Sequence, residues 1–221
     1  MRTNIRIMLV AFLLMCCTQV YSADISPPPR FPLDVAPSPT LKTTPSTSLL
    51  LGSIPIVFDK TTLGEAMKQI KAGQIQHQGD AGDSIYWLCY SIRTPGGWEH
   101  LWLLSHGEMG GPEHVILGIA AKTSSSALPS TSCPILPDHL RPVKLNSGLW
   151  LRAQTEEMRK ELGKPSLQQG QWLHYESQRE LVGDPRAKDF RTDKIYERGR
   201  ISARALNGKI VEIWASKQTT D

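Results

Sequence analysis

The sequence predicts an α+β fold made of two tandem helix-plus-antiparallel-sheet repeats, with the helices packed on one face of the sheet. The first observation is that Trp87–Tyr90, Trp-Leu-Cys-Tyr, returns as Trp172–Tyr175, Trp-Leu-His-Tyr. The second is that each copy follows a short amphipathic helical pattern, and the third that each precedes an apolar run with a lysine at its end. Similar elements that recur in one order indicate a tandem repeat.

The first 22 residues have the form of a secretory signal peptide. Arg2 and Arg6 precede an apolar stretch, Ile7–Cys17, that is too short to span a bilayer. Small or permissive residues stand before Ala23, where we expect the mature chain to begin. The signal is of the Gram-negative type, so the expected location is the periplasm or the extracellular medium.

An outer-membrane lipoprotein is the alternative. Cys16 and Cys17 close the apolar stretch, and lipid attachment requires a cysteine there. The enzyme that cleaves lipoprotein signal peptides requires a small residue before that cysteine. Here Met15 precedes Cys16, and a second cysteine precedes Cys17. Membrane contact is therefore expected only if Cys16 or Cys17 is lipidated.

Two cysteines, Cys89 and Cys133, remain after removal of the signal peptide. An even pair in an exported chain indicates a disulfide. It would close a loop of about forty residues and stabilise the fold by roughly 3 to 4 kcal/mol. A pair of free buried thiols is the alternative, and an oxidising compartment disfavours it.

Residues 23–50 are dominated by proline, serine and threonine. Such a segment buries too little apolar surface to offset the entropy of ordering. We therefore expect a disordered tether before the folded part of the chain.

The first repeat is expected at residues 51–123. Thr62 and Glu65 have the spacing of a capping box, and apolar residues then recur at helical spacing until Gly73. Strands are predicted at 85–92, 98–105 and 115–121, separated by turns that contain glycine and proline.

Residues 124–147 are predicted to be a connector, held on the first sheet through Cys133. The second repeat is expected at 148–221. Thr155 is expected to cap a helix that ends at residues 163–165. Strands then follow at 171–177, 200–206 and 209–216, with Asn207-Gly208 as the last hairpin turn.

The second copy resembles the modules of the BamE (SmpA/OmlA) lipoproteins. The resemblance rests on a helix ending in Gly-Lys-Pro (163–165), an aromatic strand, and the closing hairpin Asn-Gly-Lys-Ile-Val-Glu-Ile (207–213). Two such modules in tandem resemble the β-lactamase inhibitory protein fold, over most of residues 54–217. This implies a helix-on-sheet fold whose members bind other proteins and have no catalytic site. The contact loops of those inhibitors have no counterpart here, so no functional residue is carried over.

Strand alternation separates the two faces of the predicted sheet. Leucine and tyrosine of each Trp-Leu-x-Tyr copy are assigned to the core. The opposite face is expected to hold these candidate protein-binding residues: Trp87, His100, Trp102, Trp172, His174, Arg200, Arg204 and Trp214.

Two interpretations of this aromatic face remain open. One is a recognition face, because tryptophan and arginine are common at interface hot spots and exposed apolar patches mark binding sites. The other is that the Pro-rich segment, the connector or residues 178–196 cover it. Cys89 is expected in the disulfide, whereas His174 is expected to stay free.

Residues 107–113 form a glycine-rich loop in which Glu108 and Met109 are further candidates for contact with a partner, or simply part of a hairpin connection. His100, His106 and His114 lack the spacing of a metal site, so neither a metal nor a cofactor is expected. An enzyme of unfamiliar type using these residues is the minor alternative.

Composition excludes one class of partner. The net charge of +4 comes from lysines and arginines that are scattered along the chain, so nucleic acid is not expected. We expect an exported protein-binding module, not an enzyme, that binds another exported or envelope protein, with an inhibitor as one form. The alternative is a lipid-anchored accessory subunit of an outer-membrane assembly. The sequence does not identify the partner or the oligomeric state.

Overall fold

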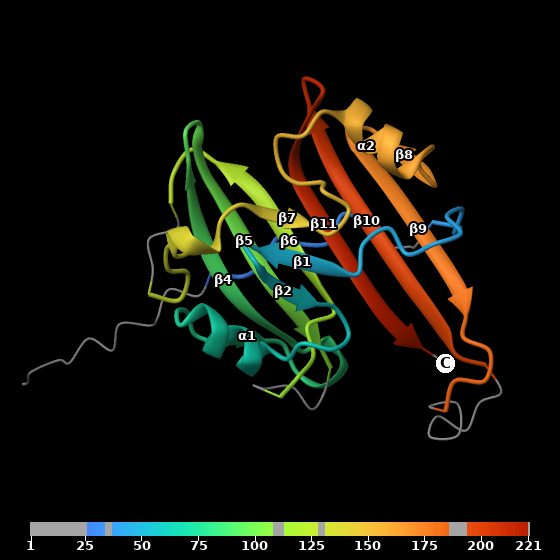
Figure 1. Ribbon diagram of the computed structural model, residues 1–221, viewed down its shortest axis with the longest axis horizontal. Coiled ribbons are helices and arrows are strands. Elements are labelled where there is room, and N and C mark those ends of the chain that lie inside the picture. Colours follow the sequence, from blue (N-terminus) through green and yellow to red (C-terminus); the bar gives the residue numbers. More distant parts are fainter. Residues whose placement is uncertain (1–25, 34–36, 108–112, 128–130, 186–193, 221) are drawn as a thin grey trace, which may run out of the picture.

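The computed structural model describes residues 26–33, 37–107, 113–127, 131–185 and 194–220, and it shows a mostly β fold (Figure 1). The predicted signal peptide, with Cys16 and Cys17, lies outside these ranges, as do Glu108 and Met109. Within the described ranges, no helix is long and apolar enough to cross a membrane.

One antiparallel sheet of eight strands dominates the molecule, in the order β3-β4-β5-β6-β11-β10-β9-β8. The strands from the two halves of the chain meet where β6 pairs with β11. Their bounds are β3 (Gln76–Gln78), β4 (Ile85–Thr94), β5 (Gly97–His106), β6 (Gly118–Ser124), β8 (Leu167–Gln169), β9 (Trp172–Glu180), β10 (Tyr196–Leu206) and β11 (Lys209–Thr220).

A smaller antiparallel sheet, in the order β2-β1-β7, packs against one face of the large one (Figure 1). Two eight-residue helices lie beside it, α1 near β4 and α2 near β9 and β10 (Figure 1). The bounds are β1 (Ser48–Leu51), β2 (Ile54–Val57), β7 (Val143–Leu145), α1 (Leu63–Ile70), α2 (Thr155–Leu162), and the 3-10 turns η1 (Ala81–Asp83) and η2 (Asp138–Leu140).

The predicted fold class, α+β with two helix-plus-sheet repeats, is wrong. The two halves form one continuous sheet, and the middle of the layer that covers it is β1, β2 and β7. β1 pairs with β7 through Leu49 and Leu145, which lie far apart in the sequence. Propensity and periodicity describe local structure, so they gave no sign of this long-range pairing.

The main core lies between the two layers. It contains Leu88, Tyr90, Leu101, Leu103 and Tyr175 from the large sheet, as strand alternation predicts. Each helix contributes only its inner positions, such as Leu63 and Met158, and the small sheet contributes the remaining cover. The helices are therefore flanks of a β sandwich and not its second layer.

The α1 helix begins with the predicted capping box. The Thr62 Oγ1 accepts from the Glu65 amide at 3.1 Å, and the Thr62 amide donates to Glu65 Oε2 at 2.9 Å. The helix ends at Ile70, where Lys71 adopts a φ of 58° and stops the helical path. In contrast, α2 has no side-chain cap, because its N-cap position is Gln154 rather than the predicted Thr155.

The Pro-rich segment differs from the disordered tether that its composition predicts. Residues 26–33, blue in Figure 1, pass behind the large sheet, and residues 37–47 then lead round the β9 edge into β1. The amides of Thr40 and Leu41 both donate to the Glu176 carbonyl at 3.0 Å. This part of the segment is thus a component of the fold.

Candidate binding surface

The face of the large sheet that is turned away from the main core is called the outer face here. The pairing registers place Trp87, Trp102, Trp172 and Trp214 on it. Alternation along the strands predicts this arrangement, because side chains two residues apart share a face. The two halves of the outer face differ in chemistry.

The half of the outer face formed by β4, β5, β6 and the adjoining part of β11 is apolar. The exposed fractions of Trp87, Trp102 and Trp214 are 0%, 1% and 7%, so these tryptophans form a second core and not an open recognition face. We call it the apolar half; its members are Trp87, Cys89, Trp102, Leu104, Ala120, Trp214 and, from the connector, Cys133.

The chain's own N-terminal segment covers part of the apolar half. We call residues 26–33 the strap. The indole Nε1 of Trp102 donates to the Ser26 carbonyl at 2.9 Å. The Phe31 ring meets Trp214 edge-on, with 5.3 Å between ring centroids, and the Arg200 guanidinium lies 5.0 Å from the Phe31 centroid. Two tryptophans are therefore in contact with the strap.

The connector after β6 covers another part. Cys133 is joined to Cys89 by a disulfide, as the cysteine count predicts. Just after the two cysteines in the sequence, Ser91 exchanges backbone hydrogen bonds with Pro134 and Leu136, both at 2.8 Å. The covered interpretation of the aromatic face therefore holds for this half of the sheet.

His100 lies beneath the same connector. Its Nε2 is 3.1 Å from the Ser126 carbonyl and its Nδ1 is 3.3 Å from the Ser91 hydroxyl. Burial lowers the pKa of His100, and the charge of Lys122 acts in the same direction, while the bond to Ser126 opposes them. A neutral, enclosed histidine does not act as a contact residue.

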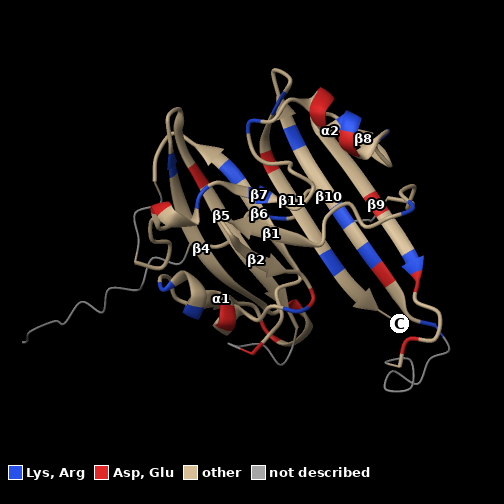
Figure 2. Cartoon of the chain, viewed as in Figure 1, with Lys and Arg blue, Asp and Glu red and all other residues tan. Residues whose placement is uncertain are grey.

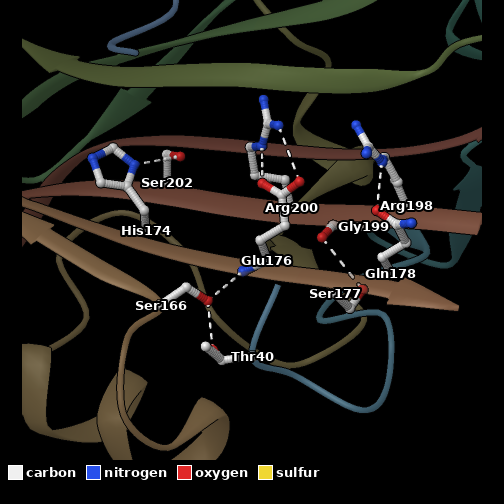
Figure 3. Close-up of polar contacts among 10 residues, drawn as sticks. All are labelled: Thr40, Ser166, His174, Glu176, Ser177, Gln178, Arg198, Gly199, Arg200 and Ser202. Atoms are coloured by element: carbon white, nitrogen blue, oxygen red, sulfur yellow. Dashed lines mark hydrogen bonds and ion pairs between the residues drawn. The ribbon is translucent and has the colours of Figure 1, made fainter. Parts of the chain in front are cut away.

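The half formed by β9, β10 and the adjoining part of β11 is polar, and we call it the polar half. Arg200 makes a bidentate pair with Glu176, at 2.8 and 3.3 Å (Figure 3). Arg204 binds Glu212 at 3.1 and 3.2 Å. Figure 2 shows basic and acidic positions close together along these strands. These pairs neutralise two of the arginines within the sheet, and Phe31 of the strap lies over Arg200 at one margin of this half.

Arg198 is the most available charge of the polar half. Its side chain is exposed, and its Nε donates to the Gln178 amide oxygen at 2.9 Å (Figure 3). Trp172 is part-exposed, and its ring stacks on His174 with 6.0 Å between centroids. Sequence reasoning missed Arg198, although it stands two residues before Arg200 and alternation would have placed it on the same face.

His174 is not free, contrary to expectation. It is fully buried, and its Nδ1 lies 2.8 Å from the Ser202 hydroxyl (Figure 3). Burial lowers the pKa of His174, and the charge of Arg200 lowers it further. Its Nε2 has no hydrogen-bond partner. Ser202 is buried as well, so the pair is closed to a substrate and does not form a nucleophilic site.

The histidines near residues 106–114 do not converge on a metal. His106 is exposed, while His114 Nδ1 lies 2.6 Å from the Ser105 hydroxyl, which also binds the Val115 carbonyl. Among the described residues, no group of three or more His, Cys, Asp or Glu side chains could hold a metal ion. Glu108 lies outside those residues.

A cavity of about 940 Å³ lies between the strap and the outer face. Its walls are mainly apolar, with Phe31, Leu104 and Trp214 among them, and Arg200 and His106 at polar positions. One feature of the sequence indicates this site, because Phe31 is an isolated aromatic residue within a run of prolines.

Comparison of the chain with protein-family models, with curated proteins and with solved structures finds no match. The resemblance to the BamE lipoproteins and the β-lactamase inhibitory protein therefore stays a prediction. The function is argued below from the geometry of the outer face.

Proposed function

We propose that this chain is an exported protein-binding module that holds its partner on the outer face, with the polar half as the contact surface. The observation that carries this proposal is a row of three arginines, Arg198, Arg200 and Arg204, on one strand beside the part-exposed Trp172. Arginine and tryptophan are the side chains most often found at interface hot spots.

The ion pairs prepare this surface for binding. Arg200 and Arg204 are fixed by Glu176 and Glu212, so they lose little side-chain entropy when a partner docks. Three arginines stand against Glu176 and Glu212, and the third carboxylate of this face, Glu180, is paired with Lys194 at 3.7 Å, which leaves the surface positive. We therefore expect the partner to present an acidic surface, with association that weakens as salt is added.

The disulfide supports the exported location, because such bonds persist in oxidising compartments. In that setting the module would act as an inhibitor of, or a scaffold for, another exported or envelope protein. No side chain in the polar half is arranged for chemistry, so binding alone is the activity proposed.

The test is affinity capture from an envelope extract. The double variant Arg198→Glu, Trp172→Ala changes one exposed and one part-exposed side chain; it breaks the bond from Arg198 to Gln178 and removes the stacking of Trp172 on His174. It should lose the partner that the wild type retains. Lys144→Glu, at an exposed position of β7 in the other layer, is the matched control and should retain it. Equal capture by all three proteins would refute the assignment.

A further inference from the structure

We propose that the groove under the strap binds an extended, proline-rich segment of a partner protein, and that the strap is its built-in occupant, which the partner displaces. This rests on the proposed function, because it concerns the apolar half of the same outer face. It adds the class of ligand and a second point of contact beside the polar half.

The strap itself shows which ligand chemistry the groove recognises. Residues 26–33 read Ser-Pro-Pro-Pro-Arg-Phe-Pro-Leu, and four of the eight are prolines that have no amide hydrogen to donate. Its proline positions offer carbonyl acceptors but no amide donors, and Trp102 supplies an indole donor to the carbonyl of Ser26, which precedes the prolines. Aromatic grooves that bind extended proline-rich segments combine the same two features.

Phe31 gives the groove a second point of recognition. Its ring makes a T-shaped contact with Trp214, with 5.3 Å between ring centroids, and its centroid lies 5.0 Å from the guanidinium of Arg200. An aromatic side chain and a cation attract each other across this geometry. The preferred ligand therefore carries prolines followed by an aromatic residue.

The strap is held far less firmly than the chain that follows it. Among the described residues, positions 26–33 make one hydrogen bond to the sheet, from Trp102. Residues 40–47 bind the Glu176 carbonyl twice, and Thr44 donates to Glu197 at 2.7 Å. The cavity of about 940 Å³ beneath the strap shows that its side chains do not fill the groove. The strap can therefore lift while residues 40–47 keep it attached.

The tethered strap lowers the apparent affinity of the intact chain for an outside segment. A segment linked in this way competes at an effective concentration in the millimolar range, so it weakens the apparent binding of any outside segment. Loss of the Phe31 contacts should release the groove and strengthen that binding.

The probe is a fluorescent peptide with the sequence of residues 24–33, titrated against the full chain and followed by anisotropy. The Phe31→Ala chain should bind it about tenfold or more tightly than the wild-type chain. The same peptide with Phe31→Ala should bind weakly to both. Thr44→Val, which loosens the anchored part of the segment and leaves Phe31 in place, is the matched control and should bind as the wild type does.

The proposal fails if the folded Phe31→Ala chain binds the probe no better than the wild type. If that chain does not fold, Phe31→Leu, which keeps an apolar side chain but loses the ring contacts, gives the same comparison. A wild-type dimer that increases with protein concentration would assign the groove to strap exchange between copies, and would also overturn the proposal.

Failure here is separable from failure of the proposed function. Arg198→Glu with Trp172→Ala should leave probe binding to the Phe31→Ala chain unchanged. Absent probe binding with partner capture that still depends on Arg198 refutes the groove alone. Probe binding with partner capture that ignores Arg198 supports the groove and refutes the polar contact surface.

Discussion

The two halves of the outer face belong to one sheet but differ in chemistry: one is apolar and covered by other parts of the chain, and the other carries paired charges. The apolar half contributes Trp87, Trp102 and Trp214 and is covered by the strap and the disulfide connector. The polar half contributes arginines that are paired with carboxylates within the sheet. An antiparallel sheet can leave one face in water only where its side chains tolerate water. Composition thus decides which half must be covered.

The difference also separates stability from recognition. In the apolar half, the energy comes from burial and from a covalent crosslink, so substitutions there should act mainly on folding. In the polar half, the outermost side chains, such as Arg198 and Trp172, are exposed or part-exposed, so their substitution should act mainly on binding. The predictions below test this division, beginning with the largest effect.

Removal of the disulfide should have the largest effect. The crosslink joins residues 44 positions apart, and in the chain-entropy model its loss costs about 4 kcal/mol of unfolding free energy. Cys89→Ala with Cys133→Ala should therefore lower the urea midpoint strongly. Because the connector that covers His100 is attached at Cys133, the tryptophan side chains should also become more accessible to acrylamide, which would quench their fluorescence more strongly. An unchanged midpoint would mean that the connector is held without its crosslink.

Within the polar half, Arg200→Met should have the next largest effect. The Glu176 side chain is only 3% exposed, so loss of its partner leaves a buried charge uncompensated, at a cost of about 3 kcal/mol. Urea denaturation measures this loss. The double variant Arg200→Met, Glu176→Leu should recover most of it, because the unpaired charge is gone as well.

The contrasting pair in the same strands is Arg179 with Glu197. The Arg179 side chain is 60% exposed, and Glu197 keeps Lys217 as a second partner at 3.1 Å. Arg179→Met should therefore cost less than about 1 kcal/mol. Equal losses of unfolding free energy from Arg200→Met and Arg179→Met would show that burial of the ion pair does not determine the cost of breaking it.

Trp102→Phe tests the contact between the strap and the apolar half. The substitution removes the indole donor to Ser26 and part of a buried ring, so the unfolding free energy should fall by about 1 to 2 kcal/mol. Trp172→Phe, at a part-exposed ring of the polar half, should cost less than about 0.5 kcal/mol. Both losses are measured by urea denaturation, and a greater loss from Trp172→Phe would invert the division between the halves.

Much of the local structure was predictable from the sequence. The capping box of Thr62 and Glu65 formed as its spacing predicts, and the long strands lie where β-branched and aromatic runs place them. The pairing of Cys89 with Cys133 followed from the cysteine count. These features depend on residues that are close in the sequence or on the number of cysteines, so one sequence is enough to infer them.

The features that escaped prediction depend on partners distant in the sequence. Strict alternation from Trp214 would place Ile210 on the outer face, yet it is buried in the main core, because the β10–β11 pairing shifts register between Arg204 and Ala205. A bulge of this kind has no clear sequence signal. The burial of the tryptophans likewise depended on where the strap runs, which its proline content alone did not reveal.

The smallest expected effect is a pH dependence from the buried histidines of the two halves. The pKa values of His100 and His174 are lowered by burial from the ordinary value of 6.5, so the unfolded chain binds more protons as the pH falls through about 6.5. Stability from each histidine is therefore complete above that pH and declines below it, by at most about 0.7 kcal/mol per histidine between pH 7 and pH 6. His174→Gln and His100→Gln should each reduce the change of the urea midpoint with pH across this range.

The two histidines differ in their hydrogen bonds. His174 has an Nε2 without a partner, whereas the Nε2 of His100 contacts the Ser126 carbonyl, an interaction that opposes the lowering of its pKa. The polar-half histidine should therefore give the larger change, and a midpoint that rises on acidification would contradict the sign for both.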